Sequence, residues 1–241
     1  MDDWWENGML PKFGDADIVI FRGSLGNANR IVAELDWCPG AICATNAFYC
    51  SSYYEHAKRW LLHEKWAFST VEAMVAEPTE IAGKLARENQ VFVRPDSPLK
   101  PFSGRVISLN NLTLESLDFG FYYDDSMIPV VIAPIKTILR EWRFVVADRE
   151  VVAGCAYNAD DHSAMGGDVA PAMTMAIEIA RKLEPPDPVY ILDLCETDDG
   201  IRLLELNPFS GADLYSCDPD AVVFAVEQVI RRMVVNGRGV T

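Results

Sequence analysis

The feature that most constrains this chain is a tight turn between two apolar segments near its C-terminal end. The segments Val189–Cys195 and Ile201–Asn207 flank the residues Thr-Asp-Asp-Gly. A three-residue loop that ends in glycine is typical of a β-hairpin with a bulged turn, because glycine accepts the left-handed conformation there. With Asp-Asp-Gly as the loop, the register places Asp193 directly opposite Glu205.

Polar side chains lie among apolar neighbours on one face of this predicted hairpin. Glu205 and Asn207 share a face because side chains alternate along a strand. Two carboxylates directly opposite each other repel unless a cation lies between them, and carboxylate and amide oxygens are ligands that Mg²⁺ takes. The pattern predicts a magnesium site of Asp193, Glu205 and Asn207. Two alternatives stay open: a polar edge that faces solvent, and Glu205 bridged to a structural arginine.

A second segment, Val91–Gly104, carries the ingredients of a phosphate-binding loop. Arg94 closes a predicted strand over Gln90–Pro95, and Lys100 follows in a loop rich in proline. Ser103 and Gly104 can present backbone amides to an anion, and two cations beside such a turn suit a polyphosphate. A surface loop with solvated cations is the alternative.

A third group of cations lies between residues 134 and 143. The strand predicted from Val130 leads to Lys136, and Arg143 begins the next strand, so that its side chain can point steadily into a cleft. Surface cations are again the alternative.

Composition limits the class of protein. The 241 residues carry a formal net charge of -15, which disfavours binding to nucleic acid. The acidic N-terminus does not look like a signal peptide, and no apolar run is long enough for a membrane span. We therefore expect a cytoplasmic protein whose six cysteines are reduced. A zinc site is the alternative for four residues, namely Cys38, Cys43, Cys50 and His56.

Together the motifs resemble the ATP-grasp family over Thr79–Ile230. VFVRP is similar to the lysine–proline strand of the family, and LKPFSG to its phosphate flap. VVIAPIKTILREWRFVV is similar to the hinge and the strand after it, and ILDLCETDDGIRLLELNP to the magnesium hairpin. One conserved arginine and two lysines mark a subgroup that phages and bacteria often encode, and Arg94, Lys100 and Lys136 match this trio.

The resemblance implies an α+β fold in which two subdomains with antiparallel sheets grip ATP. Residues 1–78 are expected to form a small α/β N-terminal domain, and residues 79–241 the ATP-grasp domain. Within the first, a strand over Asp17–Arg22 precedes a helix over Leu25–Leu35. A further helix is expected over Tyr54–His63, and a capping box from Ser69 to Glu72 predicts another.

The implied activity is an ATP- and Mg²⁺-dependent carboxylate–amine ligase that forms an amide bond through an acyl phosphate. Its substrates are small-molecule or peptide carboxylates and amines, and a homodimer is one option for its assembly. A kinase and a non-catalytic nucleotide-binding interaction protein are the alternative functions. The resemblance gives catalytic roles to Arg143 and Lys100, and nucleotide-binding roles to Arg94, Lys100, Lys136, Ser103, Gly104 and Ile135. The metal ligands are Asp193, Glu205 and Asn207.

Some positions depart from the family pattern or match no motif. Arg94 stands where the family usually has lysine, and the hinge at 132–135 lacks the acidic residue that receives ribose. Pro134 there has no N–H to donate. For the acceptor substrate the candidates are Arg22, Gly23, Ser24, Tyr53, Tyr54 and the loop 157–167, in which His162 could serve as a base.

Overall fold

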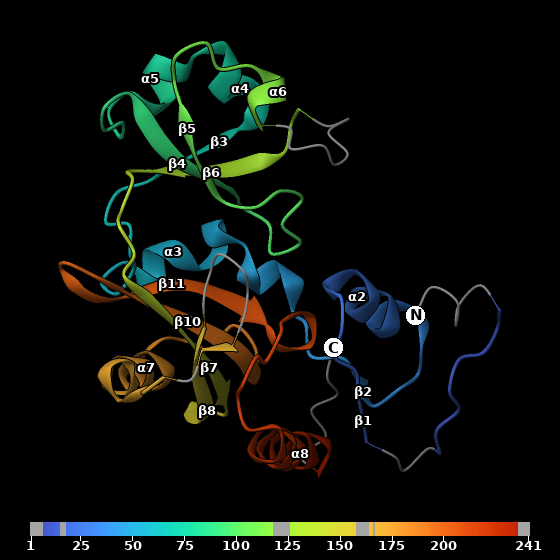
Figure 1. Cartoon of the computed structure of the whole chain (residues 1–241). Coiled ribbons are helices and arrows are strands. Elements are labelled where there is room, and N and C mark those ends of the chain that lie inside the picture. Colours follow the sequence, from blue (N-terminus) through green and yellow to red (C-terminus); the bar gives the residue numbers. More distant parts are fainter. Residues whose placement is uncertain (1–6, 15–17, 118–125, 158–163, 166, 236–241) are drawn as a thin grey trace. The chain divides into compact units, whose positions relative to one another are not determined.

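The computed structural model of the chain describes residues 7–14, 18–117, 126–157, 164–165 and 167–235 (Figure 1). These residues form two compact units. Unit 1 takes the described residues of Met1–Thr45, Trp142–Asp193 and Leu206–Thr241, and unit 2 takes those of Asn46–Glu141 and Leu194–Glu205. The domain boundary at residue 78 stays a prediction. No helix in the described ranges is long and apolar enough to cross a membrane.

Unit 1 begins with a small β–α–β element. Strand β1 (Val19–Ile20) pairs in parallel with β2 (Pro39–Gly40), and helix α2 (Leu25–Glu34) connects them. The hydroxyl of Ser24 accepts from the Asn27 amide and so caps the helix. The buried face of α2 packs against Ala41. The α/β character predicted for this segment is therefore present.

The larger sheet has the strand order β11-β10-β7-β8-β9. Its strands are β7 (Arg140–Ala147), β8 (Glu150–Tyr157), β9 (Ala164–Met165), β10 (Val189–Thr197) and β11 (Gly200–Pro208). Helices α7 (Ala170–Lys182) and α8 (Pro219–Val235) both contact β8. Asp148 and Arg149 have positive φ values, 51° and 67°, as a two-residue hairpin turn of type I′ requires.

The hairpin of β10 and β11 confirms the turn predicted from the sequence. Gly200 has φ = 102°, so the third loop residue takes the left-handed conformation that favours glycine. The strands extend to Thr197 and from Gly200, slightly further than predicted. The pairing of Asp193 with Glu205 stays a prediction.

Unit 2 contains a four-stranded antiparallel sheet of order β3-β6-β4-β5. The strands are β3 (Ala67–Thr70), β4 (Gln90–Pro95), β5 (Arg105–Ser108) and β6 (Pro129–Ala133). Three short helices, α4 (Val71–Ala76), α5 (Pro78–Ala82) and α6 (Leu114–Leu117), lie together at this sheet (Figure 1). Val91 and Val93 pack into the core with residues of α4 and α5. The alternate residues of β4, Phe92 and Arg94, therefore belong to the opposite face.

Three predictions about local structure were wrong or incomplete. Thr70, not Ser69, caps α4 by accepting from the Ala73 amide at 3.2 Å. Ser69 lies in β3, which pairs with β6, so tertiary pairing moved the start of the helix by one residue. The helix predicted over Tyr54–His63 is α3 (Cys50–Ala57), which begins and ends earlier. Strand β5 was not predicted.

Candidate functional site

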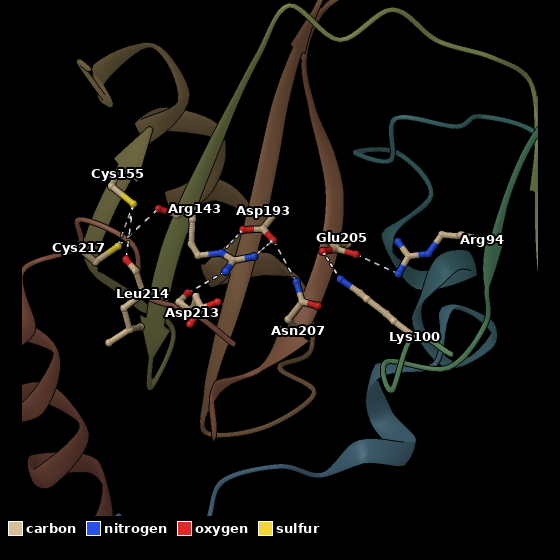
Figure 2. Close-up of polar contacts among 10 residues, drawn as sticks. All are labelled: Arg94, Lys100, Arg143, Cys155, Asp193, Glu205, Asn207, Asp213, Leu214 and Cys217. Atoms are coloured by element: carbon tan, nitrogen blue, oxygen red, sulfur yellow. Dashed lines mark hydrogen bonds and ion pairs between the residues drawn. The ribbon is translucent and has the colours of Figure 1, made fainter. Parts of the chain in front are cut away.

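Glu205 is the centre of an ion-pair cluster in unit 2. Its Oε2 lies 2.9 Å from Nη2 of Arg94, and its Oε1 lies 2.7 Å from Nζ of Lys100 (Figure 2). Burial alone would lower the pKa of Arg94, but Cys50 and Glu205 raise it well above its ordinary value. Two predicted phosphate ligands thus meet one predicted metal ligand, and one carboxylate neutralises only one of the two cations.

A cavity of about 270 Å³ lies within unit 2. Four residues predicted to bind nucleotide line it, namely Arg94, Gly104, Ile135 and Lys136. The register pairs Phe92 with Val106, and both side chains line the same cavity. Alternation along the edge strands of one sheet therefore gives the cavity apolar surface next to cations. The remaining lining residues are Tyr54, Leu62, His63, Arg105, Ile138 and Leu204.

Gly104 is needed for a close approach of side chains at this cavity. A Cβ at this position would lie 2.7 Å from Cζ of Phe92 and 3.4 Å from Cβ of Arg94. Ser103 is placed differently, because its carbonyl accepts a hydrogen bond from Nε of Arg105 at 2.9 Å and the residue does not line the cavity. Lys136 makes a loose ion pair with Asp199, with 3.6 Å between Nζ and Oδ2.

His63 is a cavity residue that the sequence did not indicate. It lies in the irregular segment between α3 and β3, and only its three-dimensional neighbours reveal its position. Its ring stacks on Phe92 with 5.4 Å between centroids. Burial, Arg94 and Lys136, in that order, lower its pKa to about 4, so the ring is neutral at physiological pH.

Unit 1 contains a second polar cluster, around Asp193. Nε and Nη2 of Arg143 donate to the two carboxylate oxygens at 2.9 and 2.7 Å, and Nδ2 of Asn207 donates at 3.0 Å (Figure 2). Nη1 of Arg143 donates to the Asp213 carbonyl at 2.7 Å. Asp193 is fully buried, and the structure brings together three residues that the sequence singled out.

Aromatic rings complete the surroundings of Arg143. Its Cζ lies 4.6 Å from the ring centroid of Tyr215 and 5.4 Å from that of Tyr157, and the two rings stack on each other. Burial would lower the pKa of Arg143, but Asp193 raises it, so the guanidinium stays charged. Sequence reasoning missed Tyr215, which follows β11 in an irregular segment.

The predicted metal ligands match Mg²⁺ in donor chemistry. Asp193, Glu205 and Asn207 supply carboxylate and amide oxygens, and a carboxylate has about four lone-pair positions, so an ion pair does not exhaust it. In the described part of the chain no three His, Cys, Asp or Glu side chains form a group that could hold a metal ion. This finding leaves no support for the zinc alternative among the described cysteines, which are all free thiols.

The candidates for acceptor binding take structural roles as far as the structure describes them. Nη1 of Arg22 donates to the Ala212 carbonyl at 2.8 Å, and Ser24 caps α2. Tyr53 and Tyr54 are buried, which raises the pKa of both phenols. His162 and most of its loop lie outside the described residues.

An antiparallel sheet with cations over a cavity, together with the β10–β11 hairpin, defines an ATP-grasp protein. The chain belongs to an ATP-grasp domain family, the third family of the clade named for one arginine and two lysines, which it matches over residues 34–226. Members of this superfamily include ATP-dependent carboxylate–amine ligases. No curated protein matches the chain.

Solved structures share the fold at low sequence identity. D-alanine–D-alanine ligase from Bacillus anthracis, solved with ATP, is 13% identical, with a TM-score of 0.55 over 98% of this chain and 83% of that one. A RimK domain ATP-grasp protein from Sphaerobacter thermophilus is 14% identical, with a TM-score of 0.54 over 97% and 84%. The ATP-grasp ligase PsnB, solved with a minimal precursor, is 13% identical, with a TM-score of 0.51 over 81% and 64%. Such identities establish the fold alone.

Proposed function

We propose that the chain is an ATP- and Mg²⁺-dependent carboxylate–amine ligase that forms an amide through an acyl phosphate. The observation that carries this proposal is the cavity of unit 2. Arg94 and Lys136 line it beside apolar side chains, with Gly104 at the point of closest approach. A nucleotide has the same two kinds of surface, an apolar base and anionic phosphates.

The cations take phosphate oxygens in this proposal. Arg94 presents a planar fork that suits phosphate, while Lys100 and Lys136 act as point charges. Arg94 and Lys100 exchange part of their contact with Glu205 for contact with the nucleotide. Ser103 and Gly104 supply backbone to the phosphates, and Ile135 packs against the base.

Asp193, Glu205 and Asn207 are the proposed Mg²⁺ ligands. When bound, the ion neutralises phosphate charge and orients the terminal phosphoryl group. Arg143 donates three of its five N–H groups to Asp193 and the Asp213 carbonyl, as described above. We assign its other N–H groups to charge that develops during phosphoryl transfer, where pre-positioned donors contribute most.

The reaction consists of two displacements that balance. A carboxylate oxygen of the substrate attacks the γ-phosphorus, and the bond to ADP breaks. An amine then attacks the carbonyl carbon of the acyl phosphate, inorganic phosphate leaves, and the amine loses one proton. Because PsnB was solved with a precursor, we include peptides with amino acids among the substrates to be tried.

The test is Mg²⁺-dependent ADP release from ATP in the presence of pooled amino acids and peptides, with mass spectrometry of the products. We expect stoichiometric ADP and a new amide. Lys136→Met should suppress release strongly, and Lys182→Met, at a surface pair with Glu178, should leave it unchanged. A phosphorylated product without an amide would instead identify a kinase, and nucleotide binding without any turnover would identify a binding module.

A further inference from the structure

His63 is a buried polar side chain whose ring is left unsatisfied in unit 2. The residue is 7% exposed, and its Nδ1 has no hydrogen-bond partner within the part of the chain that the structure describes. A buried nitrogen without a partner destabilises the fold, because it has lost its water without a replacement. A residue kept at such a position needs an explanation other than stability.

The ring of His63 lines the cavity described above, so a bound molecule can meet it. The ring is neutral, and a neutral imidazole offers one donor and one acceptor. Rotation of the ring by a half-turn, or a change of tautomer, decides which nitrogen faces the cavity. In either state His63 presents a hydrogen-bonding edge in a wall that is otherwise apolar.

The other polar residues of the lining have different chemistry. Arg94, Arg105 and Lys136 are cations, which suit phosphate rather than a neutral heterocycle. Tyr54 is the second neutral polar residue of the lining, and its hydroxyl is engaged with the thiol of Cys50. His63 is therefore the lining residue best suited to read a neutral group with donors and acceptors.

Its neighbours favour a flat aromatic ligand. His63 stacks on Phe92 at an interplanar angle of 23°, and Ile135, Ile138 and Leu204 add apolar surface. The hinge segment contributes little polarity, because Pro134 has no N–H to donate. Discrimination between nucleobases must then come from a side chain outside the hinge.

We propose that His63 is a specificity-determining residue that hydrogen-bonds the edge of the nucleobase held in this cavity and thereby selects one base over the others. The inference rests on the nucleotide-binding part of the proposed function. A site that hydrogen-bonds a ligand discriminates strongly against analogues that leave its buried group unpaired.

The experiment compares the full chain with His63→Leu, His63→Gln and the control His56→Leu, which changes an exposed histidine of α3. Dissociation constants are measured by calorimetry with Mg²⁺ and ATP, GTP, CTP or UTP, and with tripolyphosphate, which has no base. We expect wild type to prefer one base. His63→Leu should weaken that nucleotide about tenfold, as the loss of one hydrogen bond to a buried group implies. It should level the four nucleotides and leave tripolyphosphate unchanged.

The variants separate this inference from the function on which it rests. His63→Gln, which keeps a donor and an acceptor, should retain more selectivity than His63→Leu, and His56→Leu should match wild type. If His63→Leu does not fold, the selectivity of His63→Gln relative to wild type decides. Wild-type base selectivity in both His63 variants, or no base preference in wild type, would overturn the inference alone. Failure of wild type to bind any of the five probes would overturn the nucleotide site itself.

Discussion

The two arginine–carboxylate clusters differ in charge balance and exposure. In unit 1, Arg143 is 7% exposed and Asp193 is fully buried, and a bidentate contact matches one cation to one carboxylate. In unit 2, Arg94 is 12% and Glu205 is 13% exposed, and Lys100, at 40%, shares the same carboxylate. The first cluster is closed and neutral. The second keeps one excess positive charge beside a cavity, which favours an anionic ligand.

The largest expected effect follows from breaking the closed cluster. Asp193→Asn keeps the shape of the side chain but leaves the guanidinium of Arg143 buried without its counter-charge. We expect a loss of about 3–5 kcal/mol in the free energy of unfolding, since removal of one partner strands the other. Urea unfolding followed by circular dichroism measures it. The control is Glu227→Gln, which removes an exposed pair with Arg231 on α8 and should cost at most about 1 kcal/mol. A cost for Asp193→Asn as small as that of the control would refute the closed-cluster description.

Buried titrating groups should separate the two units by pH. His63 in unit 2 has its pKa lowered to about 4, so the unfolded chain binds the proton more tightly. Its contribution to stability is present above pH 6.5 and is lost as pH falls towards about 4. Asp187 in unit 1 has its pKa raised to about 6 by burial, although the Ala44 amide donates to it. Its contribution is present at low pH and is lost as pH rises through 6.

Substitution isolates each contribution. His63→Leu should remove about 2–3 kcal/mol of the stability loss between pH 6.5 and pH 4. Asp187→Asn should remove a loss of opposite sign between pH 4 and pH 6. Unfolding free energies measured at intervals over this range give both slopes. Parallel pH profiles for wild type and His63→Leu would show that His63 does not titrate as its burial implies.

A smaller change in stability is expected from the open cluster. Glu205→Gln leaves Arg94 and Lys100 without a carboxylate, but Lys100 remains partly exposed. We expect a cost of about 1–2 kcal/mol, between the values for exposed and buried pairs. The Mg²⁺-dependent part of the ATP-induced rise in melting temperature should shrink. Binding of metal-free tripolyphosphate should strengthen, because the cavity becomes more positive.

This pair of measurements tests whether Glu205 is a metal ligand or only a partner for cations. If the Mg²⁺-dependent shift is unchanged while tripolyphosphate binds more tightly, Glu205 serves the cations alone. A similar loss of the Mg²⁺-dependent shift in Asp193→Asn would support the proposed metal ligand set. That comparison should be made below the melting temperature of this less stable variant.

Local patterns in the sequence were enough to predict much of the fold. Strand β4 has the predicted bounds, since alternation of apolar residues and a terminal proline mark both its face and its end. The turn at Gly200 follows from the conformational freedom of one residue. The capping box at Ser69 failed because pairing of β3 with β6 decides where that strand ends. Local propensity cannot report a contact with a strand that is distant in the sequence.

The candidate site divides in the same way. Arg94, Gly104, Ile135 and Lys136 were found because their residue types lie at strand ends and turns, and all four line one cavity. His63 was missed, since it stands in an irregular segment and only long-range packing brings it to Phe92. The contact between Lys100 and Glu205 joins residues 105 positions apart, which no spacing rule anticipates.

The smallest expected effect concerns a single methyl group. Gly104→Ala would place Cβ 2.7 Å from Cζ of Phe92, so the ring must shift towards the cavity. We expect a loss of about 1–2 kcal/mol in stability, typical of overpacking, and weaker ATP binding in calorimetry. The matched control is Gly26→Ala in α2, where nothing lies within 4 Å of the new Cβ. This control should gain about 0.5–1 kcal/mol from helix propensity. If both alanines stabilise the chain and ATP binding does not change, Phe92 is free to yield, and the close approach at Gly104 does not shape the nucleotide cavity.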